Sequence, residues 1–206
     1  MLRKLVGAAA LTVVLALAAC GGKNAAPAEG DMALGAPEGA KVTVVEYASV
    51  TCVHCAAWQK ETWPGFKAKY VDTNKVRYVF RELPTPPQDV SVAGFLVARC
   101  AGADKYFDVV HQYMADQETL FSGATPPRDW LMRTANAAGL NTSQFEACVS
   151  DKAGIAAFET RVQSAFKAGV TGTPAFFVND QRVQTPGGEG ASLADLSTAI
   201  DAALAK

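Results

Sequence analysis

The sequence has no excess of charge of either sign. Of its 206 residues, 19 are Lys or Arg and 20 are Asp or Glu, so the formal net charge is −1 at pH 7. Nucleic-acid binding proteins normally carry a basic surface, because contacts with phosphates supply much of their affinity. We therefore expect no nucleic-acid partner. Half of the residues are hydrophobic, which is enough for one substantial core.

The chain also lacks a hydrophobic run long enough for a transmembrane helix, which needs about 20 apolar residues. Its one extended run, over 5–19, follows two basic residues and ends in Leu-Ala-Ala before Cys20. A basic start and a short apolar stretch are typical of a secretion signal. The ending resembles a bacterial lipobox, in which the signal is cleaved before a cysteine that is then acylated. We favour this over an ordinary signal, and predict a signal peptide over 1–19, a lipid on Cys20, and anchoring on the periplasmic side of a bacterial membrane.

Large apolar side chains are scarce between residues 21 and 40, where Gly, Ala and Pro dominate. Such a segment buries too little surface to offset the entropy lost on ordering it. We predict that 20–40 is a lipidated, flexible tether and that 41–206 is the folded domain.

Periodicity in the domain predicts both strands and helices. The expected elements are a strand over 42–47, a helix from 52 to about 70 kinked at Pro64, a strand over 76–80, helices over 89–168, a hairpin over 175–184, and a last helix capped by Ser192. Ser143 and Glu146 have capping-box spacing and predict a helix start. This order predicts an α/β, thioredoxin-like fold with a helical insertion at about 89–168.

Cysteine is also scarce. There are five, and if Cys20 carries a lipid then Cys52, Cys55, Cys100 and Cys148 remain. Cys100 and Cys148 both fall on apolar faces of predicted helices. Because an exported protein meets an oxidising compartment, we predict a structural disulfide between these two, rather than two buried free thiols.

The motif Cys52-Val53-His54-Cys55 lies where a predicted strand ends and a helix begins. The unpaired N–H groups and the dipole at a helix N-terminus favour a thiolate, so Cys52 should have a lowered pKa and act as the nucleophile. Cys55, one turn later, should be more buried and resolve mixed disulfides, while His54 adds a donor beside the sulfurs.

Other uses of this motif are less well supported. A structural disulfide fits poorly at a strand-to-helix junction, and haem attachment would need His at position 56, which is Ala. A zinc site normally has four ligands, and we predict no metal. A non-catalytic lipoprotein that binds a metal through Cys52, Cys55 and His54 stays a less favoured alternative.

A second motif lies far downstream, where Gly172-Thr173-Pro174 precedes an apolar run over 175–178. Since proline cannot pair in a central strand, it should stand at the entrance of this one. By itself the motif indicates only an ordinary trans-proline turn. Together with the segment from Glu46 to Cys55, however, it resembles the DsbA-type disulfide oxidoreductases, over about residues 41–204.

The resemblance implies roles for particular residues. Cys52 would be the exposed nucleophile and Cys55 the resolving thiol, with no cofactor. Thr173 and Pro174 would form a cis peptide facing the sulfurs, and the Thr173 backbone would hold a substrate peptide as an added strand. Glu46 would be a buried acid beneath the dithiol that accepts or relays protons.

Two departures from the family pattern bear on the direction of electron flow. Val53-His54 stands where the best-known oxidases have Pro-His, and Thr173 precedes the proline where they often have Val. We expect an oxidase that donates its disulfide to folding exported proteins with free thiols and is reoxidised by a membrane quinone-linked thiol oxidase. A reductase or isomerase of the same fold is the alternative. Residues 21–40 are too short for the dimerisation domain that isomerases usually carry, which argues against an isomerase. We expect a monomer.

Overall fold

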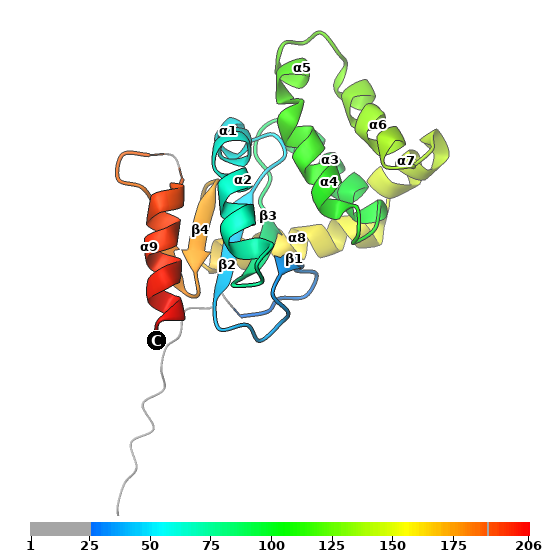
Figure 1. Cartoon of the computed structure of the whole chain (residues 1–206). Helices are drawn as coiled ribbons and strands as arrows, with labels where there is room; N and C mark the ends of the chain where they lie inside the picture. Colours follow the sequence, from blue (N-terminus) through cyan, green and yellow to red (C-terminus); the bar gives the residue numbers. More distant parts are fainter. Residues whose placement is uncertain (1–25, 189) are drawn as a thin grey trace, which may run out of the picture.

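A computed structural model describes residues 26–188 and 190–206, so the predicted signal peptide and Cys20 lie outside the described residues. The strands form one mixed sheet in the order β1-β3-β2-β4-β5 (Figure 1). Their bounds are Met32–Gly35 (β1), Thr43–Ala48 (β2), Arg77–Glu82 (β3), Ala175–Val178 (β4) and Gln181–Val183 (β5). β2 and β3 are parallel, while the other neighbours pair antiparallel.

Helices α1, α2 and α9 cover one face of the sheet, α8 crosses the opposite face, and α3 to α7 lie together beside the sheet (Figure 1). The helical segments are α1 (Val53–Glu61), α2 (Trp63–Phe66), a π-helical turn (Lys67–Val71), α3 (Gln88–Cys100), α4 (Tyr106–Ala115), α5 (Gln117–Phe121), α6 (Pro127–Ala137), α7 (Thr142–Val149), α8 (Lys152–Lys167) and α9 (Leu193–Leu204). The predicted order, with its helical insertion, is therefore confirmed. Within the described ranges, no helix is long and apolar enough to cross a membrane.

Successive side chains of β2 point to opposite faces of the sheet, and each face packs against its own part of the hydrophobic core. Val44 packs in the layer that contains the side chains of α1, α2 and α9. Val45 and Tyr47 pack in the opposite layer with Ala165 of α8. Fully burying such apolar side chains stabilises the fold by roughly 1.5–3 kcal/mol each, so β2 is held from both sides. This rigid central strand ends just before the cysteine motif.

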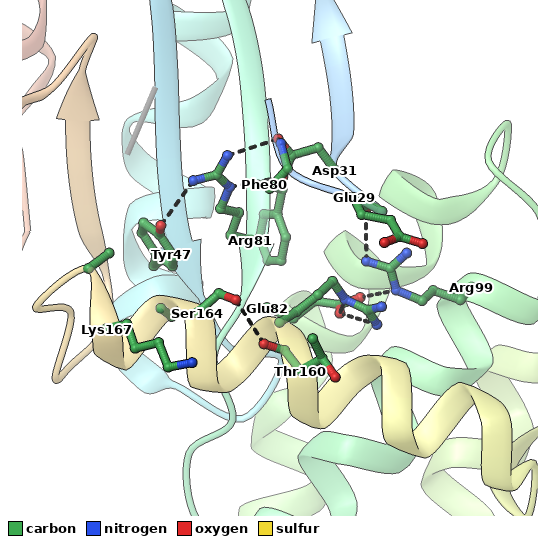
Figure 2. Close-up of a pocket in the computed structure, with 15 residues that line it drawn as sticks. Glu29, Asp31, Tyr47, Phe80, Arg81, Glu82, Arg99, Thr160, Ser164 and Lys167 are labelled. Carbon is green, nitrogen blue, oxygen red and sulfur yellow. Dashed lines mark hydrogen bonds and ion pairs between the residues drawn. The ribbon is translucent and has the colours of Figure 1, made fainter. Parts of the chain in front are cut away.

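The tether prediction is wrong for the residues just before the domain, because the sheet includes β1 at its edge. Met32 and Leu34 pack against the main core, and β1 pairs antiparallel with β3. Arg81 forms an ion pair with Asp31 at 2.8 Å, and Arg99 donates a hydrogen bond to the Gly30 carbonyl (Figure 2). Contacts distant in sequence thus order a segment that has little apolar surface of its own.

Two helix boundaries differ from the sequence-based expectations. The helix expected over 52–70 is interrupted at Thr62, which ends α1 just before the Pro64 turn. Ser143 and Glu146 do not form the capping box. The box is made by Asn141 and Gln144, because Asn141 has the extended backbone that a capping residue needs while Ser143 is already helical. The predicted Ser192 cap of α9 is confirmed.

Candidate active site

The two motif cysteines lie at the N-terminus of α1, directly beyond the buried strand β2. Cys52 is the N-cap residue, and its Sγ accepts a hydrogen bond from the backbone N–H of Cys55 at 3.2 Å. Both cysteines are free thiols in this structure. A sulfur in this position meets the unpaired N–H groups and the positive end of the helix dipole, both of which favour the thiolate.

Hydrogen bonding lowers the pKa of Cys52 from 9.0 to about 6. The largest cause is a hydrogen bond from the Cys55 thiol, the Thr173 side chain lowers the pKa further, and the backbone N–H groups of Cys55 and His54 add to it. Burial opposes the shift, but the donors outweigh it. Cys52 is also more enclosed than the resemblance implied, with only 6% of its surface exposed. The reactive sulfur is therefore a stabilised thiolate in a narrow opening.

Cys55 has the opposite electrostatic environment. It is fully buried, and burial raises its pKa well above 9.0. Its hydrogen bond to Cys52 and the negative charges of Cys52 and Glu46 raise the pKa further. At neutral pH the pair therefore consists of a Cys52 thiolate and a Cys55 thiol, which is the division of charge that an attacking and a resolving cysteine require.

The second sequence motif lies against the first. The Thr173–Pro174 peptide is cis, as the resemblance implied, and the Thr173 carbonyl oxygen lies 3.5 Å from Cys52 Sγ, from which it accepts a hydrogen bond when Cys52 is protonated. The Thr173 hydroxyl is also buried, and it faces Cys52 and helps to lower the pKa of that thiol. Residues 121 positions apart in sequence thus form one site.

Glu46 is buried in the sheet layer beneath the dithiol, as expected, with 1% of its surface exposed. Burial raises its pKa from 4.5 to about 8, a hydrogen bond from Tyr78 lowers it, and the charge of Cys52 raises it. The Tyr78 hydroxyl donates to Glu46 Oε2 at 2.5 Å. Glu46 is therefore largely protonated at neutral pH, and its charge state is coupled electrostatically to those of both sulfurs.

Polar residues that the sequence analysis missed hold the loop between β2 and α1. Gln117 of α5 is buried, and its amide donates to the carbonyls of Val50 at 2.8 Å and Cys52 at 3.1 Å. The Ser49 hydroxyl lies 2.8 Å from that of Ser91 in α3. The helical insertion thus buttresses the dithiol loop, and no local sequence signal indicates these contacts.

The remaining motif residues lie on the outer side of α1. Val53 is 54% exposed beside Cys52, which is unusual for a large aliphatic side chain in this domain. His54 lines a shallow groove of about 250 Å³ with residues of α1 and of the loop that precedes α9. Substrate approaching Cys52 would meet both side chains.

The predicted disulfide between Cys100 and Cys148 is present, and it joins α3 to α7 within the helical insertion. His111 is half-buried, with its ring against that of Trp63. Over 26–188 and 190–206, no group of three or more His, Cys, Asp or Glu side chains could hold a metal ion. The alternative of a metal-binding module therefore gains no support from these residues.

A separate cavity of about 480 Å³ lies on the α8 face of the sheet (Figure 2). Most of the charged side chains that line this cavity form ion pairs with one another. Glu82 is buried and binds Arg99 at 2.7 Å and Arg161 at 2.9 Å, and Tyr106 donates to the same carboxylate. These contacts join α3, α4 and α8 to the end of β3, so we interpret the cluster as structural.

Together, the dithiol at a helix N-terminus, the cis-proline beside it and the helical insertion define a thioredoxin-like redox protein. The family model described as thioredoxin matches residues 27–202. Relatives named as protein-disulfide oxidoreductases include one from Rickettsia bellii, 36% identical over 85% of this chain and 65% of its own, and one from Rickettsia prowazekii, 37% identical over 85% and 62%. This chain thus spans less than two thirds of these relatives.

Among solved structures, alpha-DsbA1 of Wolbachia pipientis superposes with a TM-score of 0.74 and 25% identity, over 87% of this chain and 93% of that one. The chain therefore belongs to the thioredoxin family, and within it the chain is similar to the DsbA-type proteins.

Proposed function

We propose that this protein is an exported thiol–disulfide oxidoreductase that oxidises other proteins by donating the Cys52–Cys55 disulfide. The observation that carries the proposal is the contrast between the two sulfurs, with a lowered pKa at Cys52 and a raised pKa at Cys55. Stabilising the Cys52 thiolate stabilises the reduced enzyme, and a dithiol with a stable reduced form is a strong oxidant.

In the proposed reaction, a substrate thiolate attacks Cys52 Sγ of the oxidised enzyme and forms a mixed disulfide. The Cys52–Cys55 bond breaks, and Cys55 leaves with the electron pair and takes up a proton. A second substrate thiolate then attacks the substrate sulfur, and Cys52 leaves as a thiolate. The substrate has lost two electrons to form its disulfide, and the enzyme has gained them as its dithiol.

The cis-proline loop would guide the substrate. The Thr173 backbone lies against Cys52, so an extended peptide pairing with it as an added strand would bring its cysteine to Cys52 Sγ. The exposed Val53 adds an apolar contact suited to unfolded segments, which expose hydrophobic residues. We therefore propose folding proteins with free thiols as the substrates.

Location and redox partner complete the proposal. The sequence of residues 1–20 supports export and a lipid on Cys20, which would keep the enzyme on the periplasmic side of a bacterial membrane. Reoxidation needs an acceptor of two electrons, and we propose a membrane quinone-linked thiol oxidase. We expect the enzyme to act as a monomer.

The deciding experiment is the reduction potential of Cys52–Cys55 against glutathione, with Cys52→Ala as the blank. A potential near −120 mV, as in strongly oxidising members of this fold, would support disulfide donation. A potential near −270 mV, as in thioredoxin, would reject the oxidase and favour a reductase. Zinc or copper retained stoichiometrically by the reduced protein after dialysis would instead favour metal binding.

A further inference from the structure

Tyr78 and Glu46 form a buried pair beneath the dithiol. In the parallel ladder Glu46 lies opposite Phe80 and Val44 opposite Tyr78, so Tyr78 is a diagonal neighbour of Glu46 on the same face of the sheet. The Tyr78 side chain is fully buried, and its ring packs between those of Trp63, Phe66 and Phe107. The ring therefore has little freedom to turn away from the carboxyl group.

The hydroxyl of Tyr78 has Glu46 Oε2 as its hydrogen-bond partner within the described part of the chain. A phenol has one proton to donate, and here Oε2 receives it. A protonated Glu46 that accepts this hydrogen bond at Oε2 carries its own proton on Oε1. When Glu46 is ionised, the same hydrogen bond becomes a charge-assisted one and is stronger. Tyr78 thus stabilises the carboxylate more than the acid.

We propose that Tyr78 is a positioning residue that holds Glu46 in place and stabilises its carboxylate while Glu46 exchanges a proton with Cys55. The inference rests on the proposed function. As substrate attacks Cys52, the leaving Cys55 sulfur takes the proton of Glu46, and the carboxylate remains bonded to Tyr78. During reoxidation the proton returns to Glu46 as Cys55 attacks the mixed disulfide at Cys52.

The other ionisable groups around the pair are the two cysteines and Tyr106 of α4. The charge of Cys52 acts on Glu46, and Cys55 and Tyr106 act electrostatically on Tyr78. The residue of β4 that pairs with Glu46 is Phe176, which does not titrate. The hydrogen bond of Tyr78 lowers the pKa of Glu46 against burial and the Cys52 charge, which both raise it. Losing the hydroxyl should therefore make Glu46 a more basic carboxylate.

Tyr78→Phe tests the inference, and Tyr106→Phe is its matched control. Both tyrosines are fully buried and each donates to a buried glutamate, but Tyr106 binds Glu82 of the structural cluster. The first readout is the rate at which the reduced protein is oxidised by glutathione disulfide above the Cys52 titration near pH 6, where the remaining pH dependence follows the Glu46 carboxyl. The second is the direct titration of the Glu46 carboxyl by carbon NMR, which does not depend on turnover.

We expect Tyr78→Phe to move both midpoints upward by about one pH unit or more, since hydrogen bonds to charged groups contribute that much to the equilibrium. Tyr106→Phe should leave both unchanged. In a Glu46→Gln background, Tyr78→Phe should cause no further change in the oxidation profile. Tyr78→Met, which also lacks the hydroxyl but fills the core differently, should shift the midpoints in the same direction as Tyr78→Phe.

Unchanged midpoints in Tyr78→Phe, or equal shifts in Tyr78→Phe and Tyr106→Phe, would overturn the inference. A shift that persists in the Glu46→Gln background would also overturn it, because Tyr78 would then act by another route. If the unmodified protein shows no thiol–disulfide exchange, the proposed function fails, but the NMR titration still decides whether Tyr78 controls Glu46.

Discussion

Titration of the reduced protein should reveal a Cys52 thiolate with a midpoint near pH 6. The prediction rests on the position of Cys52 as the N-cap of α1, where its sulfur accepts hydrogen bonds from the Cys55 thiol and from backbone N–H groups. At pH 7 a group with a pKa of about 6 is about 90% ionised, against about 1% for an unperturbed thiol of pKa 9.0. The difference is large enough to measure directly.

The lowered pKa also has a defined effect on stability. Because the pKa of Cys52 is lower in the folded than in the unfolded chain, its contribution is fully present above about pH 9 and is lost as the pH falls through about 6. The full contribution is roughly 4 kcal/mol, and at pH 7 it is roughly 1–2 kcal/mol. Stabilising the reduced form by this amount raises the two-electron potential at pH 7 by roughly 30 mV.

Thiolate absorbance in the ultraviolet would follow the titration, with Cys52→Ala as the blank. The rate of alkylation by iodoacetamide should show the same midpoint, because only the thiolate reacts. Cys55→Ala should raise the Cys52 pKa, since it removes the largest cause of the lowering. A midpoint at about pH 8.5 or above in the unmodified protein would equal that of a free cysteine and refute the reasoning.

Three further predictions concern groups outside the Cys52–Cys55 dithiol. Gln117→Leu leaves the buried Val50 carbonyl without its hydrogen bond, while the Cys52 carbonyl keeps the one from the Ala56 N–H. The change should lower the free energy of unfolding by about 1–3 kcal/mol in a denaturant titration, and an unchanged free energy of unfolding would show that Gln117 does not buttress the loop. The double change Cys100→Ala and Cys148→Ala opens a loop with a sequence separation of 48. It should lower the free energy of unfolding by about 4 kcal/mol, without changing the Cys52 titration. Glu82→Gln leaves two arginines without their carboxylate and should destabilise the protein by about 3 kcal/mol, and a neutral effect would contradict the assigned role of the cluster.

Much of the fold was predictable because its signals are local. Each of these signals is contained within a short stretch of sequence. Examples are the β-branched run of β2, the Ser192 cap and the apolar helix faces of the insertion. β1 was missed for the opposite reason. It has four residues, and what orders it is pairing with β3 and the ion pair of Asp31 with Arg81, about 50 positions along the chain. Composition alone cannot show such long-range contacts.

The candidate site divides in the same way. The spacing of Cys52 and Cys55 and their place at a strand-to-helix junction can be read from local sequence, and a lowered pKa follows from the chemistry of helix termini. The groups that surround the two cysteines come from distant parts of the chain and are brought there by folding. The Thr173 carbonyl reaches Cys52 from 121 residues away, and Tyr78 reaches Glu46 from 32 residues away. Hydrogen bonds and burial depend on distance in space, so the pKa values of the sulfurs and of Glu46 are properties of the folded chain.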